Sequence, residues 1–291
     1  MFGRFIKNFA PVCALACMAL PLSGAEVKET PVTLNTQDGW ALSALYLPAQ
    51  AENRTVVLLH DLGKNKEAFT SFKAALNRAG FGYLAVDLRG YGQSTGKGTA
   101  SSFAKEGVDN EFNKMTRDAE AAFSFLNKKG VAESDMAVLG AGLGANVAAK
   151  SLAFAQDVPM LALISPSTNV RDVLTIPSLR VYKEGNVLIA AGAADKKMFL
   201  EASVIRNVAY VSTGENNGRV TFLTAYDLTS HEMLDKYLTP AVIQWLKTPQ
   251  RPEVLPDEPL EPETEPSGEA EGGLFIGPSA TEDALFPSVL N

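Results

Sequence analysis

Short apolar runs of four to six residues alternate with amphipathic stretches from residue 55 to residue 247. The apolar runs predict strands that are buried on both faces, and apolar spacings of three or four residues predict the helices between them. Strands are expected at 55–60, 82–87, 136–139, 160–164, 187–191 and 220–223, and helices at 66–78, 112–129, 145–155, 197–206 and 232–247. This alternation predicts an α/β fold, with a mostly parallel sheet and helices on both faces.

A hairpin pattern precedes these elements. Two alternating stretches, 32–36 and 40–46, flank Asp38-Gly39, a strong signal for a two-residue turn. An N-terminal antiparallel hairpin on the parallel strands would make the sheet mixed. Between Ile164 and Val187 the pattern is short and irregular, which predicts a small cap region.

The first 25 residues have the pattern of a secretory signal. Arg4 and Lys7 precede an uncharged apolar run from 9 to 20, and small residues follow up to Ala25. The run is too short for a comfortable membrane span, so we expect a signal peptide at 1–25 and no transmembrane span. The mature chain would begin near Glu26 and be periplasmic or secreted. The alternative is an ordinary buried N-terminal helix.

Both cysteines, Cys13 and Cys17, lie inside this segment. A chain cut after Ala25 would therefore have neither a disulfide nor a thiol nucleophile. Lipidation of Cys17 would instead anchor the protein to a membrane, although the residues before it match a lipoprotein cleavage site only weakly.

The C-terminal segment 249–291 differs in composition from the rest. It holds eight of the 16 prolines and ten acidic residues against one arginine, a charge of −9. We expect a disordered, acidic, Pro-rich tail, which leaves a near-neutral folded domain at 26–248. No basic residues cluster, so no nucleic-acid partner is expected. Two apolar patches, at 274–276 and 284–286, are either tolerated in the tail or could dock onto a protein partner.

A glycine-rich turn follows the strand at 136–139. The sequence Gly140-Ala141-Gly142-Leu143-Gly144 sits between that strand and a helix start. This is the setting of the G-x-S-x-G nucleophile elbow, which raises a reactive side chain into an active site. Gly142 stands at the central position and has no side chain, so nothing there can attack a substrate.

Four further motifs lie at strand ends in the same order as in a known family. They are His60-Asp61-Leu62-Gly63, the segment Asp87 to Ser94, Asp195 and His231. Together with the elbow they resemble the α/β-hydrolase family, over residues 30–247. The resemblance implies a triad in the chain order nucleophile, acid, histidine: the vacant Gly142, Asp195 and His231. It also implies an oxyanion hole made by the backbone N–H groups of Leu62 and Leu143.

Several of these residues have simpler interpretations. Asp195 could cap the helix that follows it, and His231 could be a surface histidine at a helix entry. Arg89 and Ser94 are expected to hold loop structure. Asp61 stands where relatives often have glycine, and a carboxylate beside the hole would disfavour an oxyanion.

The sequence thus indicates a hydrolase homologue that has lost covalent ester or acyl hydrolysis. It would bind a small ester-like or acyl ligand, or a protein partner through the 249–291 tail, with no cofactor and no metal. The alternative is an active esterase that uses a displaced serine, Ser165 or Ser94, or a water activated by Asp195 and His231. On this interpretation Gly142→Ser alone should restore measurable ester turnover.

Overall fold

The computed structural model describes residues 28–213, 219–225 and 230–249. The chain divides into two compact units, Met1–Pro252 and Glu253–Asn291. The expected signal peptide at 1–25 lies outside the described residues, as does the tail from residue 250 onward. Within the described part, no helix is both long and apolar enough to span a membrane.

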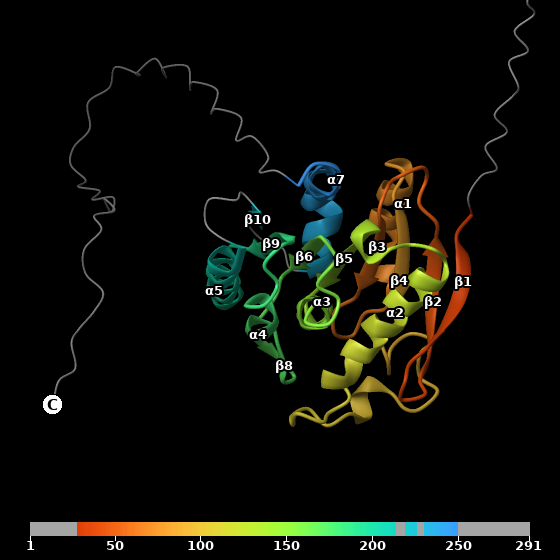
Figure 1. Cartoon of the computed structure of the whole chain (residues 1–291). Coiled ribbons are helices and arrows are strands. Elements are labelled where there is room, and N and C mark those ends of the chain that lie inside the picture. The colour runs from red at the N-terminus through yellow and green to blue at the C-terminus, as the bar shows by residue number, and fades with distance from the viewer. Residues whose placement is uncertain (1–27, 214–218, 226–229, 250–291) are drawn as a thin grey trace, which may run out of the picture. The chain divides into compact units, whose positions relative to one another are not determined.

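The first unit is built on a mixed sheet of eight strands (Figure 1). The strands lie in the order β1-β2-β4-β3-β5-β6-β9-β10. Their bounds are β1 Thr30–Asn35, β2 Ala41–Leu47, β3 Thr55–Leu59, β4 Gly82–Val86, β5 Met136–Ala141, β6 Met160–Ile164, β9 Asn186–Gly192 and β10 Val220–Ala225. Six neighbouring strands are parallel: β4, β3, β5, β6, β9 and β10. At one end of the sheet β2 pairs antiparallel with β4, and β1 pairs antiparallel with β2. This confirms the predicted fold class.

Helices cover both faces of the sheet. The α-helices are α1 Thr70–Arg78, α2 Thr116–Lys128, α3 Leu143–Ser151, α4 Ile176–Leu179, α5 Lys196–Thr213, α6 Ser230–Met233 and α7 Thr239–Lys247. Short 3₁₀ turns lie at Lys66–Phe69, Ala100–Ser102, Asn113–Met115 and Glu133–Asp135. One core packs under α1 and α7, and the other under α2, α3 and α5 (Figure 1). There are two cores because side chains alternate between the two faces of each strand. In β3, Val56 and Leu58 belong to the first core, and Val57 and Leu59 belong to the second.

Two local features differ from the sequence prediction. The hairpin turn contains three residues rather than two, because Thr36 N–H donates to the Trp40 carbonyl and Gly39 takes a left-handed φ of 82°. The last helix is interrupted by a π-helical turn at Leu234–Leu238, where the Thr239 N–H donates to the Leu234 carbonyl. Pro240 follows this turn and has no N–H for a regular helical bond.

The cap region is small, as expected. It consists of an antiparallel pair, β7 Asn169–Val170 and β8 Val173–Leu174, followed by the single-turn helix α4. Asn146 ties this region to α3, because its side-chain NH₂ donates to the carbonyls of Ser167 and Val173, each at 2.8 Å.

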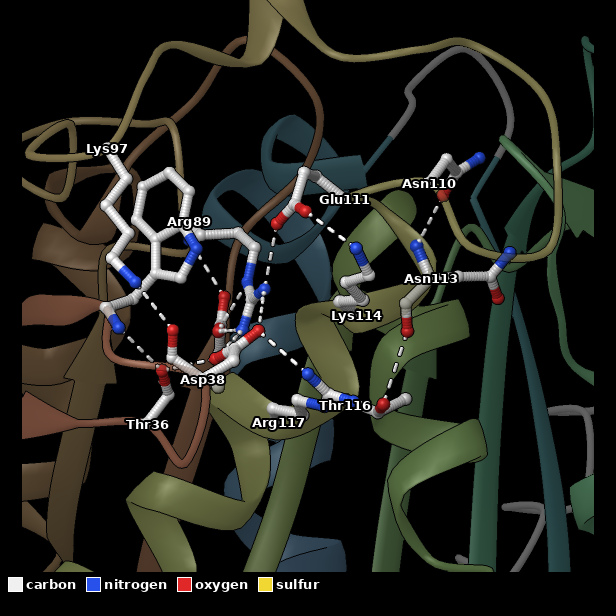
Figure 2. A network of polar contacts seen from close by, with 12 residues as sticks. Thr36, Asp38, Arg89, Lys97, Asn110, Glu111, Asn113, Lys114, Thr116 and Arg117 are labelled. Carbon is white, nitrogen blue, oxygen red and sulfur yellow. Dashed lines mark hydrogen bonds and ion pairs between the residues drawn. The ribbon is translucent and has the colours of Figure 1, made fainter.

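A fully buried arginine joins the hairpin to the sheet and to α2 (Figure 2). The Arg89 guanidinium pairs with Asp38 of the hairpin loop at 2.7 Å and with Glu111 at 2.9 Å. The guanidinium also pairs with the buried Asp118 of α2 at 2.7 Å, and the backbone N–H of Arg89 donates to the same carboxylate. The Arg89 guanidinium lies over the Trp40 ring, with its carbon Cζ 5.4 Å from the ring centroid. Arg89 is therefore a structural residue, as the sequence predicted.

The charges of this network follow from burial and pairing. Burial raises the pKa of Asp118 to about 6, against the pull of Arg89. Burial also acts to raise the pKa of Asp38, but hydrogen bonds from Arg89 and Thr36 hold it well below its usual range. The buried charge of Asp118 is compensated by Arg89, and removing Arg89 would leave that charge without a partner at a large cost in folding free energy.

We expect Arg89→Met to lower the free energy of unfolding by about 3–5 kcal/mol, because it leaves Asp118 buried without a counter-charge. Urea denaturation measures this. Arg117→Met is the matched control: Arg117 also pairs with Asp38, at 3.1 Å, but its side chain is 45% exposed. That change should cost about 0–1 kcal/mol. Equal losses for the two variants would contradict the prediction.

Candidate active site

The elbow predicted at Gly142 is present. Gly142 connects β5 to α3 with φ 52° and ψ −119°, and its N–H donates to the Ile164 carbonyl of β6 at 2.9 Å. A side chain is strained in this conformation, and glycine removes the strain. The turn brings residue 142 to the carboxyl edge of the sheet, where ligands bind in α/β folds.

The space above Gly142 is filled by another residue. A Cβ built on Gly142 would overlap the carboxylate of Asp61, with all three of the nearest atoms belonging to that group. Asp61 lies in the loop after β3 and is partly exposed. Its carboxylate therefore occupies the position from which a nucleophile would start.

The same carboxylate also fills the expected oxyanion hole. Oδ1 of Asp61 accepts the N–H of Leu62 at 2.7 Å and the N–H of Leu143 at 2.9 Å. The structure thus brings the two expected backbone donors together, on a side-chain oxygen of the protein itself. Oδ2 accepts the hydroxyl of Ser230 at 2.9 Å, a contact that the sequence analysis did not foresee.

His231 lies beside Asp61 in the first turn of α6. Its Nε2 accepts the Asp61 backbone N–H at 3.3 Å, so this nitrogen carries no proton and the ring is neutral. Burial lowers the pKa of His231 to about 4, although the negative charge of Asp61 opposes the shift. The ring packs edge-on against Phe69, with the centroids 4.5 Å apart. In the family this ring would face the nucleophile; here it faces the backbone of the residue that fills the site.

The other ring nitrogen of His231, Nδ1, is buried and has no hydrogen-bond partner among the described residues. The expected triad acid does not reach it. Asp195 is exposed and directly precedes α5, where its Oδ1 accepts the Met198 N–H at 3.0 Å. This is the helix-capping role that the sequence left open for Asp195. No described contact joins Asp195 to His231, so its role as triad acid stays a prediction.

A second histidine supports the loop that carries Asp61. His60 Nε2 accepts the Leu88 N–H at 3.0 Å, and Nδ1 lies 2.8 Å from the Asp61 carbonyl. The first bond requires an unprotonated Nε2, so Nδ1 carries the hydrogen and donates it to Asp61. Burial lowers the pKa of His60, which keeps this arrangement neutral.

The two serines considered as displaced nucleophiles are both committed to structural bonds. The buried Ser165 Oγ accepts the Ser230 N–H at 2.8 Å. Ser94 Oγ accepts the Ser43 N–H at 2.9 Å and donates to the Asp87 carbonyl. No described hydrogen bond joins either hydroxyl to His231. Among the residues that the structure covers, no group of three or more His, Cys, Asp or Glu side chains is arranged to hold a metal.

The fold and the elbow together define an α/β hydrolase. A family model described as serine aminopeptidase, S33, matches residues 50–222, more than half of the chain, and the chain belongs to this family. No curated protein sequence matches the chain.

Three solved structures illustrate the similarity of fold. An esterase of Pyrococcus furiosus is 18% identical, with 76% of this chain and 92% of that chain covered and a TM-score of 0.62. An esterase of Exiguobacterium antarcticum is 16% identical, with 75% and 100% covered and a TM-score of 0.53. A dienelactone hydrolase of Anabaena variabilis is 13% identical, with 76% and 95% covered and a TM-score of 0.56. At these identities the likeness concerns the fold alone.

We expect the buried neutral His231 to make the protein sensitive to acid. An unfolded histidine titrates near pH 6.5 and the folded one near pH 4, so the unfolded chain binds more protons between these values. The contribution of His231 to stability should therefore fall by roughly 1–3 kcal/mol as the pH drops from 7 to 4. His231→Gln keeps an acceptor but does not titrate, so it should lose less stability over the same range. Parallel pH profiles of urea denaturation for the two proteins would refute the prediction.

We also expect Asp61 to determine the cost of a side chain at the elbow. Gly142→Ser should lose more than the roughly 1–3 kcal/mol of backbone strain, because it also collides with the carboxylate. In an Asp61→Gly background the cost should shrink, with a coupling of roughly 0.5–3 kcal/mol measured by urea denaturation.

Gly130 provides the control for this cycle. It has a left-handed φ of 87°, and a Cβ built on it meets nothing within 4 Å. Gly130→Ser should therefore cost the same whether residue 61 is aspartate or glycine. An equal cost for Gly142→Ser in both backgrounds would mean that Asp61 does not fill the elbow.

Proposed function

We propose that this chain is an α/β-hydrolase homologue that has lost serine-type covalent hydrolysis. The observation that carries the proposal is the Asp61 carboxylate, which occupies both the nucleophile position above Gly142 and the oxyanion hole. A serine hydrolase needs the first space for its hydroxyl and the second for the substrate oxyanion. One side chain closes both.

The arrangement of His231 supports the same proposal. A general base must reach the proton that it removes and must be oriented by a partner on its other nitrogen. His231 Nε2 is engaged by a backbone N–H, and Nδ1 has no partner among the described residues. The alternative, an active esterase with a displaced serine or an Asp195–His231-activated water, requires contacts that the described residues do not make.

In place of hydrolysis, we propose that the protein binds a small ester-like or acyl ligand or a protein partner. Protein binding is favoured by an apolar stripe on α5. Leu200, Val204 and Val211 recur at helical spacing and are 65%, 48% and 77% exposed. The 249–291 tail, proposed as a second contact, lies outside the described residues from residue 250.

We further propose that the protein is secreted or periplasmic, on the basis of the pattern at residues 1–25. The intact mass of the exported protein tests this. A mature start near Glu26 would support it, a lipidated Cys17 would replace it with membrane anchoring, and a retained Met1 would exclude both.

The wild-type protein should not react with a fluorophosphonate probe and should not hydrolyse p-nitrophenyl acetate above background. Gly142→Ser alone should also stay inactive, which revises the expectation from sequence, because Asp61 still occupies the hole. The double variant Gly142→Ser, Asp61→Gly should gain both probe labelling at position 142 and measurable turnover, since it supplies a hydroxyl and frees the Leu62 and Leu143 donors.

The control is the same double variant with His231→Gln. Turnover should fall by roughly tenfold, less than the usual 10²–10⁴ for a general base, because Nδ1 has no described partner. Stoichiometric probe labelling of any serine in the wild-type protein would overturn the proposed function.

A further inference from the structure

The apolar stripe on α5, formed by Leu200, Val204 and Val211, points away from the sheet. α5 packs on β9 and β10 at one end of the sheet (Figure 1). Its buried side chains lie on one face and include those of Ala202, Ile205 and Ala209. Since an α-helix has about 3.6 residues per turn, the stripe lies on the opposite face. The exposed face of a surface helix is ordinarily polar, so an apolar stripe there marks an interaction surface.

The stripe has the spacing of helices that pair along their length. Asn207, which is also exposed, falls in line with it, so the row reads Leu200, Val204, Asn207 and Val211. We call these residues the outer row. Their separations of four, three and four positions are the a/d spacing of a coiled-coil seam, in which a single Asn sets the register of the pair. The outer row therefore fits a second helix.

A hollow lies beside the outer row, between α5 and the end of α4. It has a volume of about 330 Å³, and its lining residues include Val204, Val208 and Val211 of α5 and Arg180, which directly follows α4. Leu200 projects from the same face of α5, about three turns before Val211. The surface therefore offers both a projecting side chain and a recess, which is what a self-complementary, two-fold interface requires.

The charges of α5 favour an antiparallel neighbour. Its first turn carries the exposed Lys196 and Lys197, and its last turn contains no basic residue. The carbonyl end of a helix attracts cations, whereas the amino end repels them. A second α5 that runs antiparallel would bring its two lysines alongside this carbonyl end, while a parallel one would place lysines beside lysines. The folded domain at 26–248 is near neutral, so it adds no net repulsion between two copies.

We propose that this chain forms a homodimer through α5, with the two helices antiparallel about a two-fold axis that passes between Val204 and Asn207. Leu200 of each copy then lies against Val211 of the other and enters the hollow beside it. The two Asn207 amides lie near the axis, where each can hydrogen-bond the other. The inference deepens the proposed protein binding and rests on it, and it is independent of the loss of hydrolysis.

Sedimentation velocity of the full-length protein over a range of micromolar concentrations tests the proposal. We expect the mass to rise from that of one chain to that of two as the concentration increases. Leu200→Glu should weaken the dimer by roughly 30-fold or more, because it places a charge in each of the two hollows. Leu200 is exposed, so this variant should keep its fold, and circular dichroism verifies that.

Val108→Glu is the matched control for this measurement. Val108 is an apolar side chain that is 84% exposed, and it lies in the loop between β4 and α2, outside the outer row. A charge at this position meets no partner in the proposed dimer. The dissociation constant should therefore stay within about twofold of the wild-type value.

Cysteine cross-linking tests the orientation, in a chain that also carries Cys13→Ser and Cys17→Ser. Asn207→Cys places one thiol of each copy near the axis, so it should form an interchain disulfide under mild oxidation. Lys197→Cys is the control, since antiparallel pairing separates its two thiols by about 25 Å along the helices, far beyond the reach of a disulfide. Efficient cross-linking through residue 197 as well would indicate parallel pairing and contradict the proposal.

A protein that stays monomeric over the whole concentration range would overturn the inference, whether another protein or another segment of the chain covers α5. A dimer that Leu200→Glu does not weaken would also overturn it, because that dimer would use a different surface. The proposed loss of hydrolysis would survive either result, since labelling of a serine by the fluorophosphonate probe is what overturns it.

Discussion

Two backbone N–H groups, one in the loop after β3 and one at the start of α3, must find an acceptor, and the rest of the site depends on how they do so. Leu62 and Leu143 point their N–H groups at one place because the elbow geometry fixes them there. In a hydrolase water or substrate fills that place; a donor left without an acceptor costs about 1–3 kcal/mol. In this chain the Asp61 carboxylate is the acceptor, and the neighbouring contacts are arranged around it.

The consequences extend outward in a chain of contacts. Asp61 can turn its carboxylate over residue 142 because that residue is glycine and leaves the space empty. The Ser230 hydroxyl donates to Oδ2 of Asp61, and the Ser230 backbone N–H donates to Oγ of Ser165. His231 is then left facing a backbone N–H and stays neutral in its buried position. A glycine at the elbow and a filled hole are thus coupled features of one packing arrangement.

The frame that holds this arrangement is independent of the chemistry. Parallel strands place the ends of β3, β5, β6 and β9 at one edge of the sheet, and buried polar side chains fix the loops that follow them. Arg89 ties the hairpin and α2 to the loop after β4, and His60 ties that loop to the one carrying Asp61. Such buried, fully paired groups hold loops in position without taking part in a reaction. A fold of this kind can therefore keep the geometry of a hydrolase without a serine at its elbow.

Local patterns in the chain were enough to predict the α/β class and the order of the strands and helices, which the structure confirms. They also predicted a tight turn at Gly142 and the backbone donors Leu62 and Leu143, whose N–H groups meet at one oxygen. These features follow from periodicity, turn residues and motif order, which are encoded within short stretches of chain. The three-residue hairpin loop and the π-helical turn before Pro240 were missed because they depend on backbone details finer than periodicity.

Only the tertiary structure, in contrast, showed that the Asp61 carboxylate occupies the site. Asp61 and Leu143 are 82 residues apart, and Asp61 and Ser230 are 169 apart, so no local pattern relates them. The sequence showed that Asp61 stands where relatives often have glycine. It did not show that the Asp61 side chain reaches into the oxyanion hole. It likewise left two roles open for Asp195, and the described contacts place that residue at the start of α5. A side chain's role in a site depends on which distant groups the fold brings within hydrogen-bonding reach.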